Sequence, residues 1–143
     1  MMPEQTRFLN VDLDLWANFD LEPLVTAFGK KVYALHVGRV KRTFEAHLEL
    51  ERRTTDADST IRAFCKLIAG LPPEARAMWD AVKIRDFNIG VQAETTPHCE
   101  VFVISAPTVK SVADLGARIV FTVYSVPAAP VPEARPAAPD PSV

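Results

Sequence analysis

Residues 9–28 read LNVDLDLWANFDLEPLVTAF, and this stretch decides the fold. Apolar and polar residues alternate from Leu9 to Leu15, which is the period of a strand with one buried and one wet face. The second half begins at Asp20, a typical N-cap residue, repeats apolar residues at helical spacing and stops at Gly29. The stretch therefore predicts a half-buried strand followed directly by a helix over residues 21–28.

Residues 31–52 predict a β-hairpin with its turn at Gly38-Arg39, because a type II′ turn needs a residue that accepts positive φ. The pairs that this turn creates are Tyr33 with Phe44 and Val37 with Val40. Alternation gives the second strand an apolar face, with Ala46, Leu48 and Leu50, and a polar face, with Glu45, His47 and Glu49.

The rest of the chain predicts three more helices and three more strands. Helical spacing of apolar residues places the helices over 61–71, 75–82 and 109–115. Alternation and β-branched composition place the strands over 87–93, 99–104 and 119–126. The first two of these strands, joined by the turn residues of 95–98, predict another hairpin.

This order predicts an α+β fold: a single, mostly antiparallel sheet of about six strands with helices packed on one face. Its core matches the split βαβ, or ferredoxin-like, arrangement. We place this single domain over residues 1–126. Residues 127–143 hold six of the twelve prolines and no aromatic residue, which predicts a disordered Pro/Ala-rich tail.

Composition excludes several classes of protein. The chain has 143 residues, 48% of them hydrophobic and 24% charged, as expected for one globular domain. Sixteen Lys and Arg against eighteen Asp and Glu give a net charge of -2, so no whole-molecule field favours nucleic acid or anionic lipid. The N-terminal residues lack a signal-peptide pattern and no apolar run could span a bilayer, so we expect a cytoplasmic protein. Cys65 and Cys99 lack metal-site spacing and are expected to be reduced.

Polar residues on one side of the predicted sheet are the candidates for catalysis. Asp12 and Asp14 lie two positions apart on one strand, roughly 7 Å from each other, a separation suited to inverting glycoside hydrolysis or to flanking a metal. His47, with Glu49 two positions on, is a candidate base or metal ligand. A wet sheet face also needs polar residues for solubility alone, and no catalytic motif occurs. A small metal-dependent or hydrolytic enzyme is therefore the alternative hypothesis.

Two further segments are candidates for binding. Gly90 interrupts the strand over 87–93, which indicates a bulge or a place where a ligand comes close. Binding residues are predicted around it, namely Arg85, Asn88, Gln92 and Tyr124. The cations of the first hairpin, Arg39, Lys41 and Arg42, could contact phosphates, but cations on an edge strand also prevent aggregation.

Several stretches of the chain form a recognisable pattern: VFVIS at 101–105, Leu115-Gly116 at the end of a helix and IVFTVY at 119–124. The strand with Asp12 and Asp14, the helix start DLEP at 20–23 and LEL at 48–50 belong to the same pattern. Over about residues 7–126 the chain therefore resembles a broad bacterial family of small α+β proteins of unknown function. Some of these proteins are grouped with immunity proteins, which neutralise partner toxins by binding them, and the family offers no catalytic residues. We therefore expect a non-enzymatic protein-binding domain that needs no cofactor, metal, membrane or nucleic acid, with a homo-oligomer left open.

Overall fold

The alternating stretch forms the central strand of the sheet. In the computed structural model, which describes residues 4–126, strand β1 spans Arg7–Ala17 and pairs antiparallel with β3 on one side and β4 on the other. Val11, Leu13 and Leu15 of this strand are fully buried. The two neighbours explain why the apolar side of β1 supplies the centre of the core.

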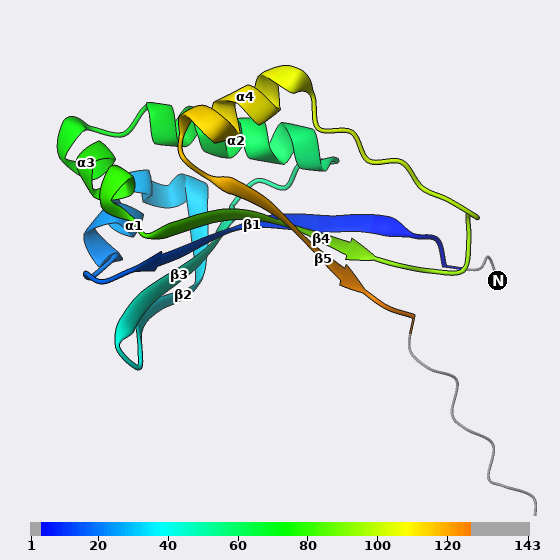
Figure 1. Ribbon diagram of the computed structural model, residues 1–143, viewed down its shortest axis with the longest axis horizontal. Helices are drawn as coiled ribbons and strands as arrows, with labels where there is room; N and C mark the ends of the chain where they lie inside the picture. The colour runs from blue at the N-terminus through cyan, green and yellow to red at the C-terminus, as the bar shows by residue number, and fades with distance from the viewer. Residues whose placement is uncertain (1–3, 127–143) are drawn as a thin grey trace, which may run out of the picture.

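The described residues form one mixed sheet of five strands with four α-helices (Figure 1). The other strands are β2 (Val32–Val40), β3 (Thr43–Leu50), β4 (Ile84–Gln92) and β5 (Arg118–Tyr124). The helices are α1 (Glu22–Phe28), α2 (Ala57–Ala69), α3 (Pro73–Ala81) and α4 (Ala106–Asp114), with a 3-10 turn η1 at Gly29–Lys31. The strand order is β2-β3-β1-β4-β5, and all four helices cover the same face (Figure 1).

The predicted α+β class is confirmed, with the helices on one face. Strands β1 and β2 are both antiparallel to β3, which lies between them, as a split βαβ unit requires. The predicted strand count is wrong, because the sheet has five strands rather than six. The sheet is also mixed, since β5 pairs with β4 in parallel.

The predicted hairpin between residues 87–93 and 99–104 is wrong. Residues 99–104 form no strand, because both edges of β4 are already paired, one with β1 and the other with β5. The side chains of residues 101–104 nevertheless alternate between exposed and partly buried positions, as those of a strand would. Phe102 and Ile104 pack against the core, whereas Val101 and Val103 are exposed.

The first hairpin exists, but its predicted turn and register are wrong. The turn is at Lys41-Arg42, between the paired residues Val40 and Thr43, and Lys41 adopts a φ of 55°. The hydroxyl of Thr43 donates to the carbonyl of Val40 and helps to close this turn. A register shift at Leu35 then changes which residues of β2 share a face. The faces of β3 are as predicted, with Ala46, Leu48 and Leu50 buried.

Side-chain caps begin two of the helices. Asp56 accepts a hydrogen bond from the amide of Ser59 (2.7 Å) at the start of α2, and Ser105 accepts one from the amide of Thr108 (3.4 Å) at the start of α4. Among residues 4–126, no helix is long and apolar enough to cross a membrane. The predicted tail over 127–143 lies outside the described residues.

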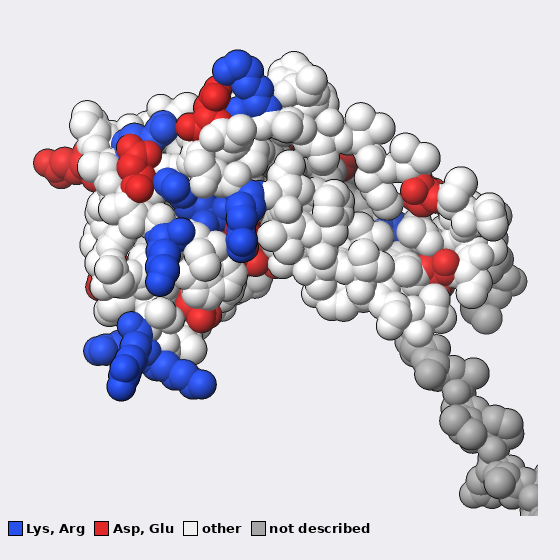
Figure 2. Space-filling view, in the orientation of Figure 1, with Lys and Arg blue, Asp and Glu red and all other residues white. Residues whose placement is uncertain are grey.

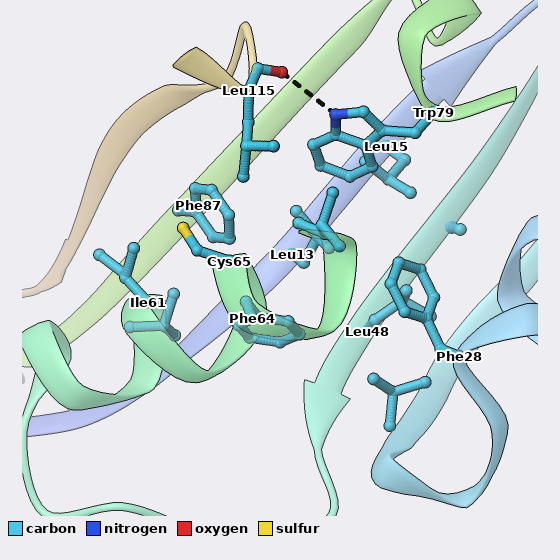
Figure 3. Close-up of a cluster of buried hydrophobic side chains, with 14 of the residues drawn as sticks. Leu13, Leu15, Phe28, Leu48, Ile61, Phe64, Cys65, Trp79, Phe87 and Leu115 are labelled. Carbon is cyan, nitrogen blue, oxygen red and sulfur yellow. Dashed lines mark hydrogen bonds between the residues drawn. The ribbon is translucent and has the colours of Figure 1, made fainter. Parts of the chain in front are cut away.

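The core lies between the sheet and the helices (Figure 3). Trp79 of α3 is fully buried, and its indole Nε1 donates a hydrogen bond to the carbonyl of Leu115 (3.1 Å). Phe64 of α2 packs against Phe87 of β4, with ring centroids 5.8 Å apart. The helices thus fill one face of the sheet and leave the other for a site.

Candidate functional site

The uncovered face of the sheet collects the polar side chains that the sequence predicts to be there. We call it the open face. Its residues come from β1, β3, β4 and β5, and include Asp12, Asp14, Glu45, His47, Glu49, Asp86, Asn88, Gln92, Thr122 and Tyr124. The predicted catalytic alternatives and three of the four predicted binding residues therefore share one surface.

A hydrogen-bonded network crosses four strands of the open face, with Asp14 at its centre. His47 Nδ1 lies 2.8 Å from one carboxylate oxygen of Asp14, and His47 Nε2 lies 3.2 Å from Glu45 Oε2. The other oxygen of Asp14 accepts from the amide of Asn88 (3.3 Å), whose own oxygen accepts from the hydroxyl of Thr122 (2.7 Å). This network ties together five of the side chains of the open face.

The carboxylates on both sides of His47 change its titration. Partial burial lowers the pKa of His47, but the hydrogen bonds to Asp14 and Glu45 outweigh it, so the pKa is raised. The hydrogen bond to His47 in turn lowers the pKa of Glu45. The network therefore favours an imidazolium between two carboxylates.

Asp12 lies in a hollow of about 290 Å³ that borders this network at Asn88 and Thr122. The hollow is also lined by Glu49, Arg53, Asn88, Gly90, Thr122 and Tyr124. Burial, together with the nearby charges of Glu49 and Asp14, raises the pKa of Asp12 to about 6. The carboxyl of Asp12, beside Glu49, therefore gains or loses its proton near pH 6.

The bulge predicted at Gly90 of β4 lies instead on β1, the strand paired with it. Phe8 pairs with Val91 and Asn10 pairs with Gly90, so the unpaired extra residue is Leu9 of β1. A side chain at position 90 would lie 3.5 Å from the carbonyl of Asn10 and 3.9 Å from the ring of Tyr124. The absence of a side chain at Gly90 keeps the hollow open.

The predicted catalytic residues separate into two pairs. Asp14 contacts His47, while Asp12 lies beside Glu49. Within the described residues 4–126, no three His, Cys, Asp or Glu side chains are arranged to hold a metal ion.

Three of the four predicted binding residues lie together, and Arg85 does not. Gln92 and Tyr124 are paired neighbours on β4 and β5, and the Gln92 amide donates to the Tyr124 carbonyl (3.3 Å). Arg85 faces the helices, where its guanidinium lies 5.8 Å from the ring of Trp79 and donates to the Trp79 carbonyl. The odd position of Arg85, against the even Asn88 and Gln92, already indicated the opposite face.

The sequence did not single out the ion pair between Asp86 and Arg118. Asp86 is buried, and Arg118 donates to both of its carboxylate oxygens, at 2.7 and 2.8 Å. These residues are directly paired on β4 and β5. The ion pair anchors the start of β5 on the sheet.

Another surface, which we call the β5 edge patch, lies at the outer edge of β5. Its members are the exposed apolar side chains of β5, with Phe121 and Val123 on the helix side of the sheet and Tyr124 on the open face. Val101 and Val103, in the segment before α4, are also exposed. Figure 2 shows an almost uncharged surface over β5 and the segment before α4. Strand β5 has one neighbour, β4, in the described part of the chain, so its outer backbone edge is unpaired there.

Comparisons with protein-family models, curated proteins and solved structures find no match for this chain. The resemblance to bacterial proteins of unknown function therefore stays a prediction. What the chain can do has to be argued from its two surfaces.

The raised pKa of Asp12 predicts that Asp12→Asn stabilises the domain at pH 8. Its folded pKa of about 6 exceeds the unfolded value of 3.8, so the stability contributed by protonated Asp12 is lost as pH rises through 6. Asparagine stays neutral, and because the site is half-buried we expect a gain of about 1 kcal/mol. Urea unfolding at pH 8 and pH 3.5 measures the difference.

The gain should largely vanish at pH 3.5, which lies below both the folded pKa of about 6 and the unfolded value of 3.8. Asp114→Asn is the control, because Asp114 is exposed and forms an ion pair with Lys110 on the same helix. A loss of stability in Asp12→Asn at pH 8, or an equal gain at both pH values, would contradict the raised pKa of Asp12.

Proposed function

We propose that this chain is a non-enzymatic protein-binding domain on a ferredoxin-like core, in which the β5 edge patch receives an extended segment of a partner protein. The partner segment would add a strand beside β5, with backbone hydrogen bonds for affinity and apolar contacts for specificity. An immunity protein that neutralises a toxin is the form of this function that the family resemblance suggests.

The exposure of apolar side chains at an unpaired strand edge carries this proposal. Phe121 and Val123 are 57% and 60% exposed, and Val101 and Val103 are 75% and 71% exposed. Concentrated apolar exposure of this kind marks interaction sites in soluble proteins. Backbone groups at such an edge are a template for pairing with another chain.

The opposite edge of the sheet shows how an edge is protected. Strand β2 carries a register shift at Leu35, and Arg39, Lys41 and Arg42 are exposed at its end and in the turn that follows. Figure 2 shows Lys and Arg side chains gathered at this hairpin tip. Irregularity and charge both discourage pairing with another strand. The cation of β5, Arg118, is instead engaged with Asp86. Of the two edges, β5 is therefore the one suited to a partner.

The predicted binding residues lie next to this edge on the open face. Tyr124 is 53% exposed and belongs to the patch, and Gln92 is its paired neighbour on β4. Aromatic residues such as Tyr are enriched at interfaces, because they combine apolar area with a polar group. We assign the contacts at the polar border of the interface to Gln92 and Tyr124.

The test is affinity capture with the full chain and the double variant Phe121→Lys/Val123→Lys. Two cations at the patch should abolish capture of a stoichiometric partner, because they oppose both apolar contact and strand pairing. Leu35→Lys is the matched control: Leu35 is a 50% exposed apolar residue on the opposite edge, and its variant should capture the same partner.

The proposal is wrong if the double variant retains the partner or if the wild type captures none. Sizing of the purified chain separates a further case. A wild-type dimer that the double variant dissociates would assign the β5 edge to a second copy instead of a separate protein.

A hydrolytic enzyme is the second candidate, and the hollow at Asp12 is the observation that favours it. A carboxyl with a pKa of about 6 beside Glu49 is suited to general acid–base chemistry near neutral pH. If this candidate is correct, Asp12→Asn abolishes turnover of whichever substrate a glycoside and ester screen identifies. A screen without turnover, or turnover that survives in Asp12→Asn, removes it.

A further inference from the structure

A large cleft lies on the helix side of the molecule, and Arg53 lines both this cleft and the hollow at Asp12. Its volume is about 760 Å³, within the roughly 300–1,000 Å³ range of small-molecule sites. It is lined by the end of α1, turn η1, the end of β3 and the C-terminal half of α2. The hydrogen bond from the amide of Glu51 to the carbonyl of Lys31 (3.0 Å) joins two sides of the cleft.

The interior of this cleft is apolar. The apolar lining consists of Ala27, Phe28, Leu50, Ala63, Leu67 and Leu71. Phe28 and Leu50 are buried and continue into the core, whereas Leu67 and Leu71 are only partly buried. A ligand here would complete the cover of these side chains and would itself need a sizeable apolar part.

Four cations surround the apolar lining. They are Lys31, Arg52, Arg53 and Lys66, all exposed, against the single carboxylate of Glu51. Within the described residues none of the four forms an ion pair, since the ion pairs there involve other side chains. The backbone carbonyl of Lys66 accepts a hydrogen bond from the amide of Gly70, so it does not add an unpaired negative dipole to the border of the cleft. The cleft therefore combines an apolar interior with an excess of three positive charges at its border.

We infer that this cleft binds a long-chain fatty acid, with the acyl chain on the apolar lining and the carboxylate at the cations. Each methylene group removed from water contributes about 0.8 kcal/mol, so the chain supplies most of the affinity. Arginine guanidinium groups can hold a carboxylate in a two-pronged geometry. Arg52 and Arg53, just after the end of β3, both line the cleft. A ligand with an apolar chain but no anionic group would not use the four cations at the border, so a fatty acid fits the cleft better than an uncharged lipid.

The experiment is a fluorescence titration of the full chain, freed of bound lipid, with dansyl-undecanoic acid as the probe. We expect saturable binding that palmitate displaces and that uncharged hexadecanol does not. Reversing two of the four border charges in Lys31→Glu/Lys66→Glu should weaken probe binding by about tenfold, because the attraction of these two cations for the carboxylate is replaced by repulsion.

Lys30→Glu is the matched control. Lys30 is exposed in the same 3-10 turn as Lys31 but does not line the cleft, so its variant should bind the probe like the wild type. Ala63→Phe, which places a ring in the cleft, should weaken the probe without changing the charge. Because the cations at the border are exposed, the double charge reversal decides the matter even if Ala63→Phe does not fold.

The inference is overturned by any of three results. These are an absence of saturable probe binding, equal displacement by hexadecanol and palmitate, and an equal loss in Lys30→Glu and the double variant. If the cleft takes an acidic peptide instead, palmitate would fail to displace the probe, and the inference would again be wrong.

Discussion

Replacing Trp79 with alanine should destabilise the domain by about 3–5 kcal/mol, the range for removing a buried Trp side chain. Trp79 is fully buried, and Figure 3 shows its indole donating to the Leu115 carbonyl, at 3.1 Å. The ring also lies under the guanidinium of Arg85. The variant therefore loses apolar burial, a buried hydrogen bond and an aromatic–cation contact together. Urea unfolding followed by far-ultraviolet circular dichroism measures the loss.

Trp79→Phe separates the hydrogen bond from the burial. Phenylalanine keeps much of the apolar area but leaves the Leu115 carbonyl without its donor, which should cost about 1–3 kcal/mol. Met78→Ala is the control, because Met78 is the neighbouring helical residue and is only partly buried. If Trp79→Ala costs less than Met78→Ala, then Trp79 is not what holds α3 to the helix end at Leu115. Should Trp79→Ala fail to fold, Trp79→Phe gives the comparison.

Local patterns were sufficient to predict the elements whose signals lie within a few residues of each other. Strand β1 follows from its own alternation, and α2 follows from the capping residue Asp56 and helical spacing. Alternation failed at residues 99–104, because it reports which side chains are buried and says nothing of backbone pairing. Phe102 and Ile104 reach the core from an irregular segment.

The parallel pairing of β4 and β5 was hidden by that same segment. A strand, a helix and a second strand predict a parallel pair joined by a crossover. Here the crossover from β4 includes the apolar residues 101–104 before α4. Their alternation predicts a strand there, and so a hairpin with β4 in place of the crossover to β5. The β5 edge patch, on which the proposed function rests, therefore could not be predicted from the sequence.

The candidate site was predictable as a face but not as a set of contacts. Alternation placed Asp12, Asp14 and His47 on one surface, which the structure bears out. Which carboxylate meets which partner depends on the register between β1 and β3, and these strands are about thirty residues apart in sequence. That register pairs Asp14 with His47 and leaves Asp12 to Glu49. One residue of slip would have put every side chain on the other face.

Asp14→Ala should destabilise the domain by about 1–3 kcal/mol at pH 6, the cost of leaving hydrogen-bond donors without their acceptor. Asp14 is buried and accepts from His47 and from Asn88, so its removal breaks the network at the centre. The effect is opposite in sign to that of Asp12→Asn, two residues away on the same strand. Urea unfolding of both variants under one set of conditions compares them directly.

The cost of Asp14→Ala should also fall as pH rises. The pKa of His47 is lowered by burial but raised more by its hydrogen bonds to Asp14 and Glu45, so its folded value lies above 6.5. The stability contributed by the imidazolium is therefore fully present below pH 6.5 and is lost as pH rises through the folded pKa. We expect a larger loss at pH 6 than at pH 9, and a proton NMR titration of His47 should show a lower pKa in the variant. An equal loss at both pH values, with the His47 pKa unchanged, would mean that Asp14 holds the open face by shape alone and that the charge on His47 has no part in it.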